Sequence, residues 1–227
     1  YYNDTEYLTL NQVQPDAVYD QEAFRRSAYK LFDANLLYTP WNKLFSRAYV
    51  DERGLRFPQT FWDDFPFVLS VIRDVERVAV TSKQYYHFMR ARAESETAAY
   101  RSNMYDKREE EHGWMLDLYA HWGVQDEASM EMVARRYVER LVGCVENVTN
   151  PRCTLSKEEK RREIAKIIGG EQARKCLKLA RPRSAMMKAI LLPIKWNNVS
   201  LTMLESRVVS KVKSSNTKLF ATLKAKR

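Results

Sequence analysis

Glycine and proline are scarce in this chain, which has six glycines and seven prolines among its 227 residues. Folds with many turns, such as β-sandwiches, and nucleotide-binding folds with glycine-rich loops need more of both. The hydrophobic content of 45% is that of a globular protein able to bury a core. We therefore expect an α+β chain that is predominantly α, with short connections between its helices.

Apolar residues at helical spacing predict two helices and a shorter one in the first hundred residues. Asp20 can cap the first helix, which runs to about Phe32, and residues 65–75 form the second. A short helix that ends at Gly54 lies between them. Alternating patterns predict three brief strands, at residues 55–58, 77–81 and 84–90. Ser82 and Lys83 join the last two of these strands.

After about residue 95 only helical patterns remain. Residues 107–122 place their large apolar side chains on one stripe, and Gly123 ends that helix. The pattern returns over residues 130–144, and Ser156 with Glu159 forms a capping box that opens a helix ending at Gly169 and Gly170. We therefore divide the chain into residues 1–98, a helical domain at 99–180, and a tail at 181–227.

The basic excess of the chain lies entirely in this tail. Residues 181–227 contain 11 Lys and Arg and one acid, Glu205, whereas the other 27 basic and 28 acidic residues nearly cancel. One helical face of the tail is apolar, and basic residues stand among its polar positions. The apolar set is Leu201, Leu204, Val208 and Val212, and the basic set is Arg207, Lys211, Lys213 and Lys218.

Two interpretations of the tail stay open from the sequence. The helix can pack on the rest of the protein through its apolar side, or it can lie on an anionic membrane surface as a basic amphipathic helix. Nucleic acid is the third kind of anionic partner, but no nucleic-acid-binding motif is present, and we expect no such binding.

Motifs for independent chemistry are missing from the sequence. It has no Asp-x-Asp, no phosphate-binding loop and no G-x-S-x-G, and His112 and His121 are too far apart for a helical metal pair. We expect no metal in this chain. Cys144, Cys153 and Cys176 form no CxxC pair, which favours free thiols in a reducing compartment. No run of about 18 apolar residues occurs. We expect a cytoplasmic protein, with peripheral attachment at the inner face of the cell membrane if the tail binds lipid.

Asp63 and Asp64 are adjacent carboxylates at the start of the predicted helix 65–75. Acids in a first helical turn have an ordinary explanation, because they cap the helix and interact favourably with its dipole. A functional interpretation therefore needs support from neighbouring segments.

Five short segments in fixed order give that support. They are Thr-Pro-Trp-Asn-Lys-Leu-Phe at 39–45, Gly-Leu-Arg-Phe-Pro at 54–58, Asp-Asp-Phe-Pro-Phe at 63–67, Tyr-Tyr-His at 85–87 and Ser-Glu-Thr at 95–97. In order and spacing, this set resembles the C-terminal, acceptor-side part of family-2 inverting glycosyltransferases of the GT-A fold. The resemblance covers about residues 31–97. It implies that this chain is a piece of a longer enzyme and is inactive alone, which agrees with a start at Tyr1 rather than at methionine.

The resemblance also implies roles for individual residues. Asp64 matches the family's general base, which takes the proton of an acceptor hydroxyl, and Asp63 stands where the family usually has Glu and would orient Asp64. Trp41 would stack on a sugar, while Asn42 and Lys43 would bind hydroxyls or phosphate. The ordinary role for Trp41 is in the core. His87 and Arg90, with Arg92, would lie near the leaving diphosphate, or they are simply a strand-end histidine and solvated arginines.

For the whole enzyme, the resemblance implies a nucleotide-sugar donor, a glycan or lipid-linked acceptor in cell-surface polysaccharide or glycoconjugate synthesis, and a Mg²⁺ or Mn²⁺ ion. The alternative is a non-catalytic helical interaction module whose basic tail binds a membrane or another anionic partner.

Overall fold

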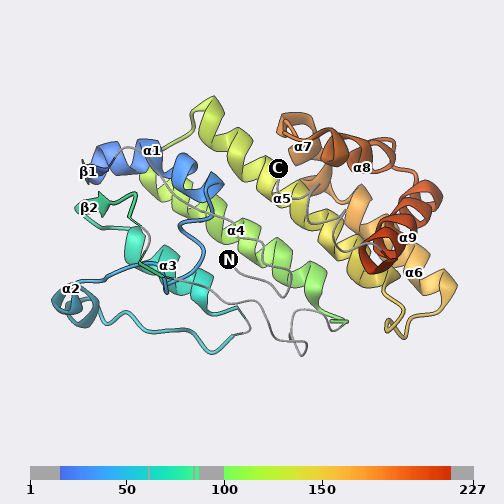
Figure 1. The fold of residues 1–227 in the computed structure, drawn as a ribbon, viewed down its shortest axis with the longest axis horizontal. Coiled ribbons are helices and arrows are strands. Elements are labelled where there is room, and N and C mark those ends of the chain that lie inside the picture. The colour runs from blue at the N-terminus through green and yellow to red at the C-terminus, as the bar shows by residue number, and fades with distance from the viewer. Residues whose placement is uncertain (1–15, 61, 84, 87–99, 216–227) are drawn as a thin grey trace. The chain divides into compact units, whose positions relative to one another are not determined.

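The computed structural model describes residues 16–60, 62–83, 85–86 and 100–215 (Figure 1). Its elements follow the order β1 (Ala17–Asp20), α1 (Gln21–Asp33), α2 (Arg47–Glu52), α3 (Asp64–Ile72), β2 (Arg77–Val80), α4 (Met104–Trp122), α5 (Glu127–Thr149), α6 (Lys157–Gly169), α7 (Glu171–Leu179), α8 (Ala185–Lys195) and α9 (Val199–Ser215). The described chain is therefore mainly helical with two short strands, which confirms the predicted α+β, predominantly α class.

The chain divides into two compact units. The first contains residues 1–93 and 113–132, and the second contains residues 94–112 and 133–227. α4 and α5 each contribute to both units, since the divisions at residues 112 and 132 fall inside these helices. Gly123, with φ of 66°, lies at the turn after α4, as predicted.

The first unit is built around α1, α3 and the C-terminal half of α4. Asp20 caps α1 by accepting a hydrogen bond from the backbone N–H of Ala23 at 2.8 Å. α1 buries the face predicted from its spacing: Phe24, Ala28, Leu31 and Phe32. Aromatic side chains of α4 pack on this face, with Trp122 edge-on to Phe24 at 5.8 Å between ring centroids. The core of this unit therefore combines aromatic and aliphatic side chains.

The strand predictions are partly wrong. β2 lies within residues 77–81, as the alternating pattern there predicted. It pairs antiparallel with β1, which the sequence did not indicate. Residues 55–58 form no strand. They are held by a hydrogen bond from Leu55 N–H to the Val50 carbonyl at 3.0 Å and by stacking of Phe57 on Phe67. Of the segment 84–90, only Tyr85 and Tyr86 are described, and neither is in a strand.

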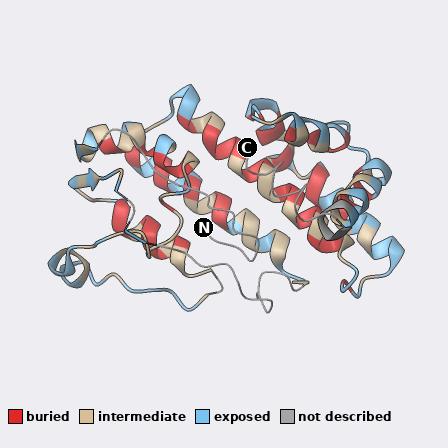
Figure 2. Ribbon diagram, viewed as in Figure 1, coloured by how far each residue is buried: buried red, intermediate tan, exposed pale blue. Residues whose placement is uncertain are grey.

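The second unit is a bundle in which α6 to α9 surround the C-terminal part of α5. Aliphatic residues dominate its core, and buried positions follow one another along α5 (Figure 2). Ser156 and Glu159 form the predicted capping box of α6, and that helix ends at Gly169 with Gly170 as its C-cap. All three cysteines are free and buried, which agrees with the predicted unpaired thiols.

The structure contradicts one of the two interpretations left open for the helix in the tail, which is α9. If this helix packed through its apolar side, Leu201, Leu204 and Val208 would be buried, but all three are exposed. The buried face instead carries Thr202 and Ser206 with Met203. These polar groups are satisfied, because the Thr202 hydroxyl donates to the Asn198 carbonyl at 2.8 Å and the Ser206 and Thr149 hydroxyls hydrogen-bond at 2.6 Å. None of the described helices has the length and hydrophobicity needed to cross a bilayer.

Candidate active site at the start of α3

Asp63 immediately precedes α3 and Asp64 is its first residue, but the Asp63 side chain does not cap the helix. The backbone of Asp63 is already helical, with φ of −58° and ψ of −23°, and its side chain makes no capping hydrogen bond. Capping residues usually have an extended backbone and accept a hydrogen bond from the first turn. The capping explanation for this pair is therefore wrong for Asp63, although both carboxylates still lie at the positive end of the helix dipole.

The residue before the pair has an unusual backbone conformation. Trp62 has φ of 63°, in the left-handed region that a bulky side chain rarely adopts. Such positions cost free energy and persist where the surrounding structure holds them, which occurs often at functional sites. The chain thus enters α3 through a strained turn directly beside two carboxylates.

Asp64 has a carboxyl group whose pKa lies above its usual range. Burial of the half-buried side chain is the main cause, and the negative charge of Asp63 adds to it. The positive charge of Lys43 acts in the opposite direction. A carboxylate with a raised pKa is a stronger base than an ordinary aspartate, which is the property that proton abstraction requires.

Lys43 and Asn42 use their polar atoms to hold the loop that precedes them. The Lys43 ammonium donates to the carbonyl of Thr39 at 2.6 Å, to the side-chain oxygen of Asn42 at 2.7 Å and to the carbonyl of Leu36. The Asn42 amide also approaches the Leu36 carbonyl, at 3.5 Å. Burial lowers the pKa of Lys43 to about 7, while the charge of Asp64 acts to raise it. Binding of hydroxyls or phosphate by Asn42 and Lys43 stays a prediction.

Aromatic contacts bring three of the motif segments together at the first turn of α3. Tyr38, next to the first motif segment, packs on Phe65 with ring centroids 5.0 Å apart, and Phe45 meets Phe67 edge-on at 5.7 Å. Phe57 stacks on the same Phe67 at 3.9 Å. Segments 39–45 and 54–58 therefore converge on segment 63–67, although up to two dozen residues separate them in the sequence.

Trp41 is half-buried and does not belong to the core. Its indole stacks on the exposed ring of Tyr86, with centroids 4.8 Å apart and an interplanar angle of 28°. This contact joins the first motif segment to the fourth one, at residues 85–87. Stacking of Trp41 on a sugar stays a prediction. His87, Arg90 and Arg92, as well as the fifth motif segment at 95–97, lie outside the described residues.

The far end of α3 is anchored by side chains that the sequence did not single out. The Nε2 atom of His121 lies 2.7 Å from the Asp74 carboxylate, and the indole N–H of Trp122 donates to the Arg73 carbonyl at 2.8 Å. Arg25 donates to the same carbonyl at 3.2 Å. About 50 residues separate these partners, so no local pattern could have revealed them. A helix that is held at its end provides a rigid support for Asp64.

A second candidate pair, Cys176 and His112, lies in the other unit. The Cys176 sulfur is 3.6 Å from Nε2 of His112, and that nitrogen also lies 2.7 Å from the Gln172 amide nitrogen. Both side chains are buried. Burial lowers the pKa of His112 to about 4 and raises that of Cys176 to about 11, so neither group ionises near neutral pH. This pair is structural, because a nucleophilic cysteine needs a thiolate.

The described residues contain no group of three or more His, Cys, Asp or Glu arranged to hold a metal ion. No family model, curated protein or solved structure matches the chain. The chemistry at the start of α3 and the order of the sequence motifs are therefore the features that bear on function.

Proposed function

We propose that this chain is the acceptor-side part of an inverting glycosyltransferase of the GT-A fold, with Asp64 as its general base. The observation that carries the proposal is the state of Asp64: a half-buried carboxylate with a raised pKa, beside a second carboxylate that does not cap the helix. Perturbed carboxylates of this kind are typical of sites of proton transfer. The motif order in the sequence supplies the reaction class.

The proposed reaction is a single displacement. The Asp64 carboxylate takes the proton of an acceptor hydroxyl while the hydroxyl oxygen attacks the anomeric carbon of a nucleotide-sugar. The bond from that carbon to the diphosphate breaks, and its electron pair leaves with the nucleotide. Because attack and departure occur on opposite faces, the configuration at the anomeric carbon inverts.

Neighbouring residues support Asp64 in this proposal. Asp63 orients Asp64 and raises its pKa, while the positive charge of Lys43 acts to lower it. Trp41 and Asn42 would contact the sugar substrates from the adjoining loop. The Mg²⁺ or Mn²⁺ ion expected for the whole enzyme finds no suitable cluster among the described residues, and the chain has no Asp-x-Asp. Within the protein, the proposed displacement gives a role only to side chains of this chain and none to a metal ion.

The wider assignments follow from the resemblance and are proposed with it. The donor is a nucleotide-sugar, and the acceptor is a glycan or a lipid-linked precursor of a cell-surface polysaccharide or glycoconjugate. The enzyme would work in the cytoplasm, and this chain alone would be inactive because the resemblance covers only the acceptor-side part of the enzyme.

The test is sugar transfer by the complete gene product against a panel of nucleotide-sugars, with four proteins compared: wild type, Asp64→Asn, Asp63→Asn and Asp117→Asn. Asp117 is an exposed carboxylate of α4 and is the matched control. Loss of a general base lowers kcat by about 100- to 10,000-fold. We expect that loss for Asp64→Asn with donor KM nearly unchanged, a smaller loss for Asp63→Asn, and wild-type turnover for Asp117→Asn.

Wild-type turnover by Asp64→Asn would refute the assignment of the base. The same is true if no nucleotide-sugar is turned over by the wild-type protein. Absence of turnover by the wild-type protein would also make the non-catalytic interaction module the leading interpretation.

A further inference from the structure

The solvent face of α9 is apolar where a solvent face is normally polar. Leu201, Leu204 and Val208 are exposed by 42%, 60% and 54%, although they stand at the i, i+3 and i+7 positions of one helical stripe. The opposite face, with the satisfied hydroxyls of Thr202 and Ser206, is the buried one. The helix therefore packs through a partly polar face and leaves its apolar stripe without a partner in the described structure.

This stripe belongs to a wider concentration of exposed apolar side chains. In the described part of the second unit, every large hydrophobic side chain that is exposed falls between residues 179 and 208. These side chains are Leu179, Leu192, Trp196, Leu201, Leu204 and Val208. Exposed apolar side chains gathered in one segment indicate an interaction surface, whereas scattered ones do not.

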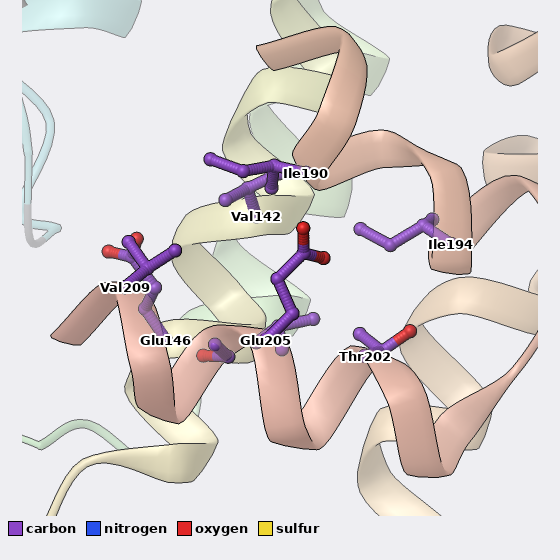
Figure 3. Close-up of a pocket in the computed structure, with 9 residues that line it drawn as sticks. Val142, Glu146, Ile190, Ile194, Thr202, Glu205 and Val209 are labelled. Atoms are coloured by element: carbon purple, nitrogen blue, oxygen red, sulfur yellow. The ribbon is translucent and has the colours of Figure 1, made fainter. Parts of the chain in front are cut away.

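The same segment carries the basic excess of the chain. Arg207 and Lys211 are exposed beside the apolar stripe of α9. Glu205, the one acid in residues 181–227, does not share this face. It extends from α9 into a pocket between Ile190 and Ile194 of α8 (Figure 3). The exposed face of α9 thus combines aliphatic and cationic side chains, with no acidic side chain among its described residues.

We propose that α9 lies on an anionic lipid surface, with Leu201, Leu204 and Val208 among the acyl chains and Arg207 and Lys211 at the lipid phosphates. A helix with an apolar stripe flanked by cations binds membranes in this way. Charge argues for lipid over a second copy of the chain, because two faces of the same positive charge repel each other. The inference does not depend on the function proposed for Asp64.

The experiment is flotation of the 227-residue chain with two kinds of vesicle, phosphatidylcholine alone and phosphatidylcholine mixed with phosphatidylglycerol. We expect flotation with the mixed vesicles only, weakened by salt. Changing Leu201, Leu204 and Val208 together to Ser lowers the partition coefficient by about 100-fold or more. Changing Arg207 and Lys211 together to Gln lowers it by about 30-fold. These side chains are exposed, so the variants keep the fold.

Two matched controls separate this face from general effects of composition. The triple change Val18→Ser, Leu44→Ser and Leu116→Ser removes the same number and kind of exposed apolar side chains from the first unit. The double change Lys157→Gln and Arg162→Gln removes two exposed cations from α6. Both controls should float as the wild type does.

Three results would overturn the proposal: no flotation with the mixed vesicles, equal flotation with both kinds, or wild-type flotation of the Leu201, Leu204 and Val208 variant. A wild-type dimer that this variant converts to a monomer in the absence of lipid would assign the face to a second copy. Sugar transfer is not measured, so failure here leaves the role of Asp64 unaffected, and failure of Asp64 leaves this result unaffected.

Discussion

Helices α3 and α6 both carry acidic residues in their first turn, and they use them in opposite ways. At the start of α6, Ser156 has an extended backbone and accepts a hydrogen bond from Glu159 N–H at 3.2 Å, while the Glu159 carboxylate accepts one from Ser156 N–H at 2.7 Å. At the start of α3, Asp63 is helical and makes no capping bond, and Trp62 before it has a positive φ.

The pKa values of Glu159 and Asp64 are consequently shifted in opposite directions. Hydrogen bonds with Ser156 lower the pKa of Glu159, whereas burial and the neighbouring Asp63 raise the pKa of Asp64. The helix dipole favours a carboxylate at both helix starts, so the dipole does not explain the difference. A carboxylate that stabilises its helix through capping hydrogen bonds is engaged in those bonds and is not available to take a proton. A carboxylate whose charge costs stability is available for chemistry.

The largest expected effect separates activity from stability at the two helix starts. In the complete gene product, Asp64→Asn should lower kcat by about 100-fold or more and leave the protein at least as stable as the wild type. Glu159→Ala should leave kcat unchanged and destabilise the protein, since the capping box is lost. Turnover assays and urea denaturation check both. A destabilised Asp64→Asn protein would show that Asp64 serves its helix as Glu159 does.

The next effect concerns the capping residues themselves. Ser156→Ala removes a capping hydrogen bond and should cost about 1 kcal/mol in the free energy of unfolding. Asp63→Ala removes no such bond and relieves repulsion of Asp64, so it should cost clearly less. Urea midpoints of the two variants measure the difference. Equal losses would mean that Asp63 caps α3 in solution.

The sequence predicted one of these two helix starts fully and the other only in part. Ser156 and Glu159 are three residues apart, and that spacing is sufficient for a capping box because both partners lie within one turn. The acid pair at Asp63 and Asp64 was equally visible. Its lack of a cap was not, because the φ of Trp62 and the packing of Phe57 and Tyr38 depend on residues distant in the sequence.

The same limit explains the other errors. Apolar spacing predicted that Leu201, Leu204 and Val208 share a face, but spacing alone does not say which face is buried. In α9 the hydroxyls of Thr202 and Ser206 find partners inside the bundle, and so the polar side packs inward. β1 was not predicted, and its pairing with β2 joins residues about 60 positions apart, which no local pattern records.

A smaller effect should appear in the pH dependence of kcat/KM. The base must be ionised, so activity falls as pH falls through the pKa of Asp64. Asp63→Asn removes a negative neighbour, lowers that pKa and moves the acidic limb to lower pH. Lys43→Met removes the positive neighbour and moves the limb to higher pH. Each shift should change the rate on the limb by about tenfold at most.

The control for these shifts is Lys30→Met, which removes an exposed cation of α1 and should leave the limb in place. Lys43 also holds its loop, so its variant needs near-ultraviolet circular dichroism to show that the loop persists. The Asp63 variant is independent of that loop. If both variants moved the limb in the same direction, their charges would not set the pKa of Asp64.

The smallest effect is the change of stability with pH at the two helix starts. Glu159 has a folded-state pKa below its unfolded value, so its contribution is present above the unfolded pKa and is lost as pH falls through the folded one. Asp64 has a folded-state pKa above its unfolded value, so its charge destabilises the fold at neutral pH and costs nothing once the carboxyl is protonated.

Urea midpoints at neutral pH should therefore lie below the wild-type midpoint for Glu159→Gln and at or above it for Asp64→Asn. Both differences should shrink toward zero as the pH falls through the pKa values of the two carboxyls and the wild type becomes protonated at both sites. Because the differences start with opposite signs, a general effect of acid on the fold cannot produce this convergence. Differences that keep their size at acid pH would mean that packing, and not charge, distinguishes the two helix starts.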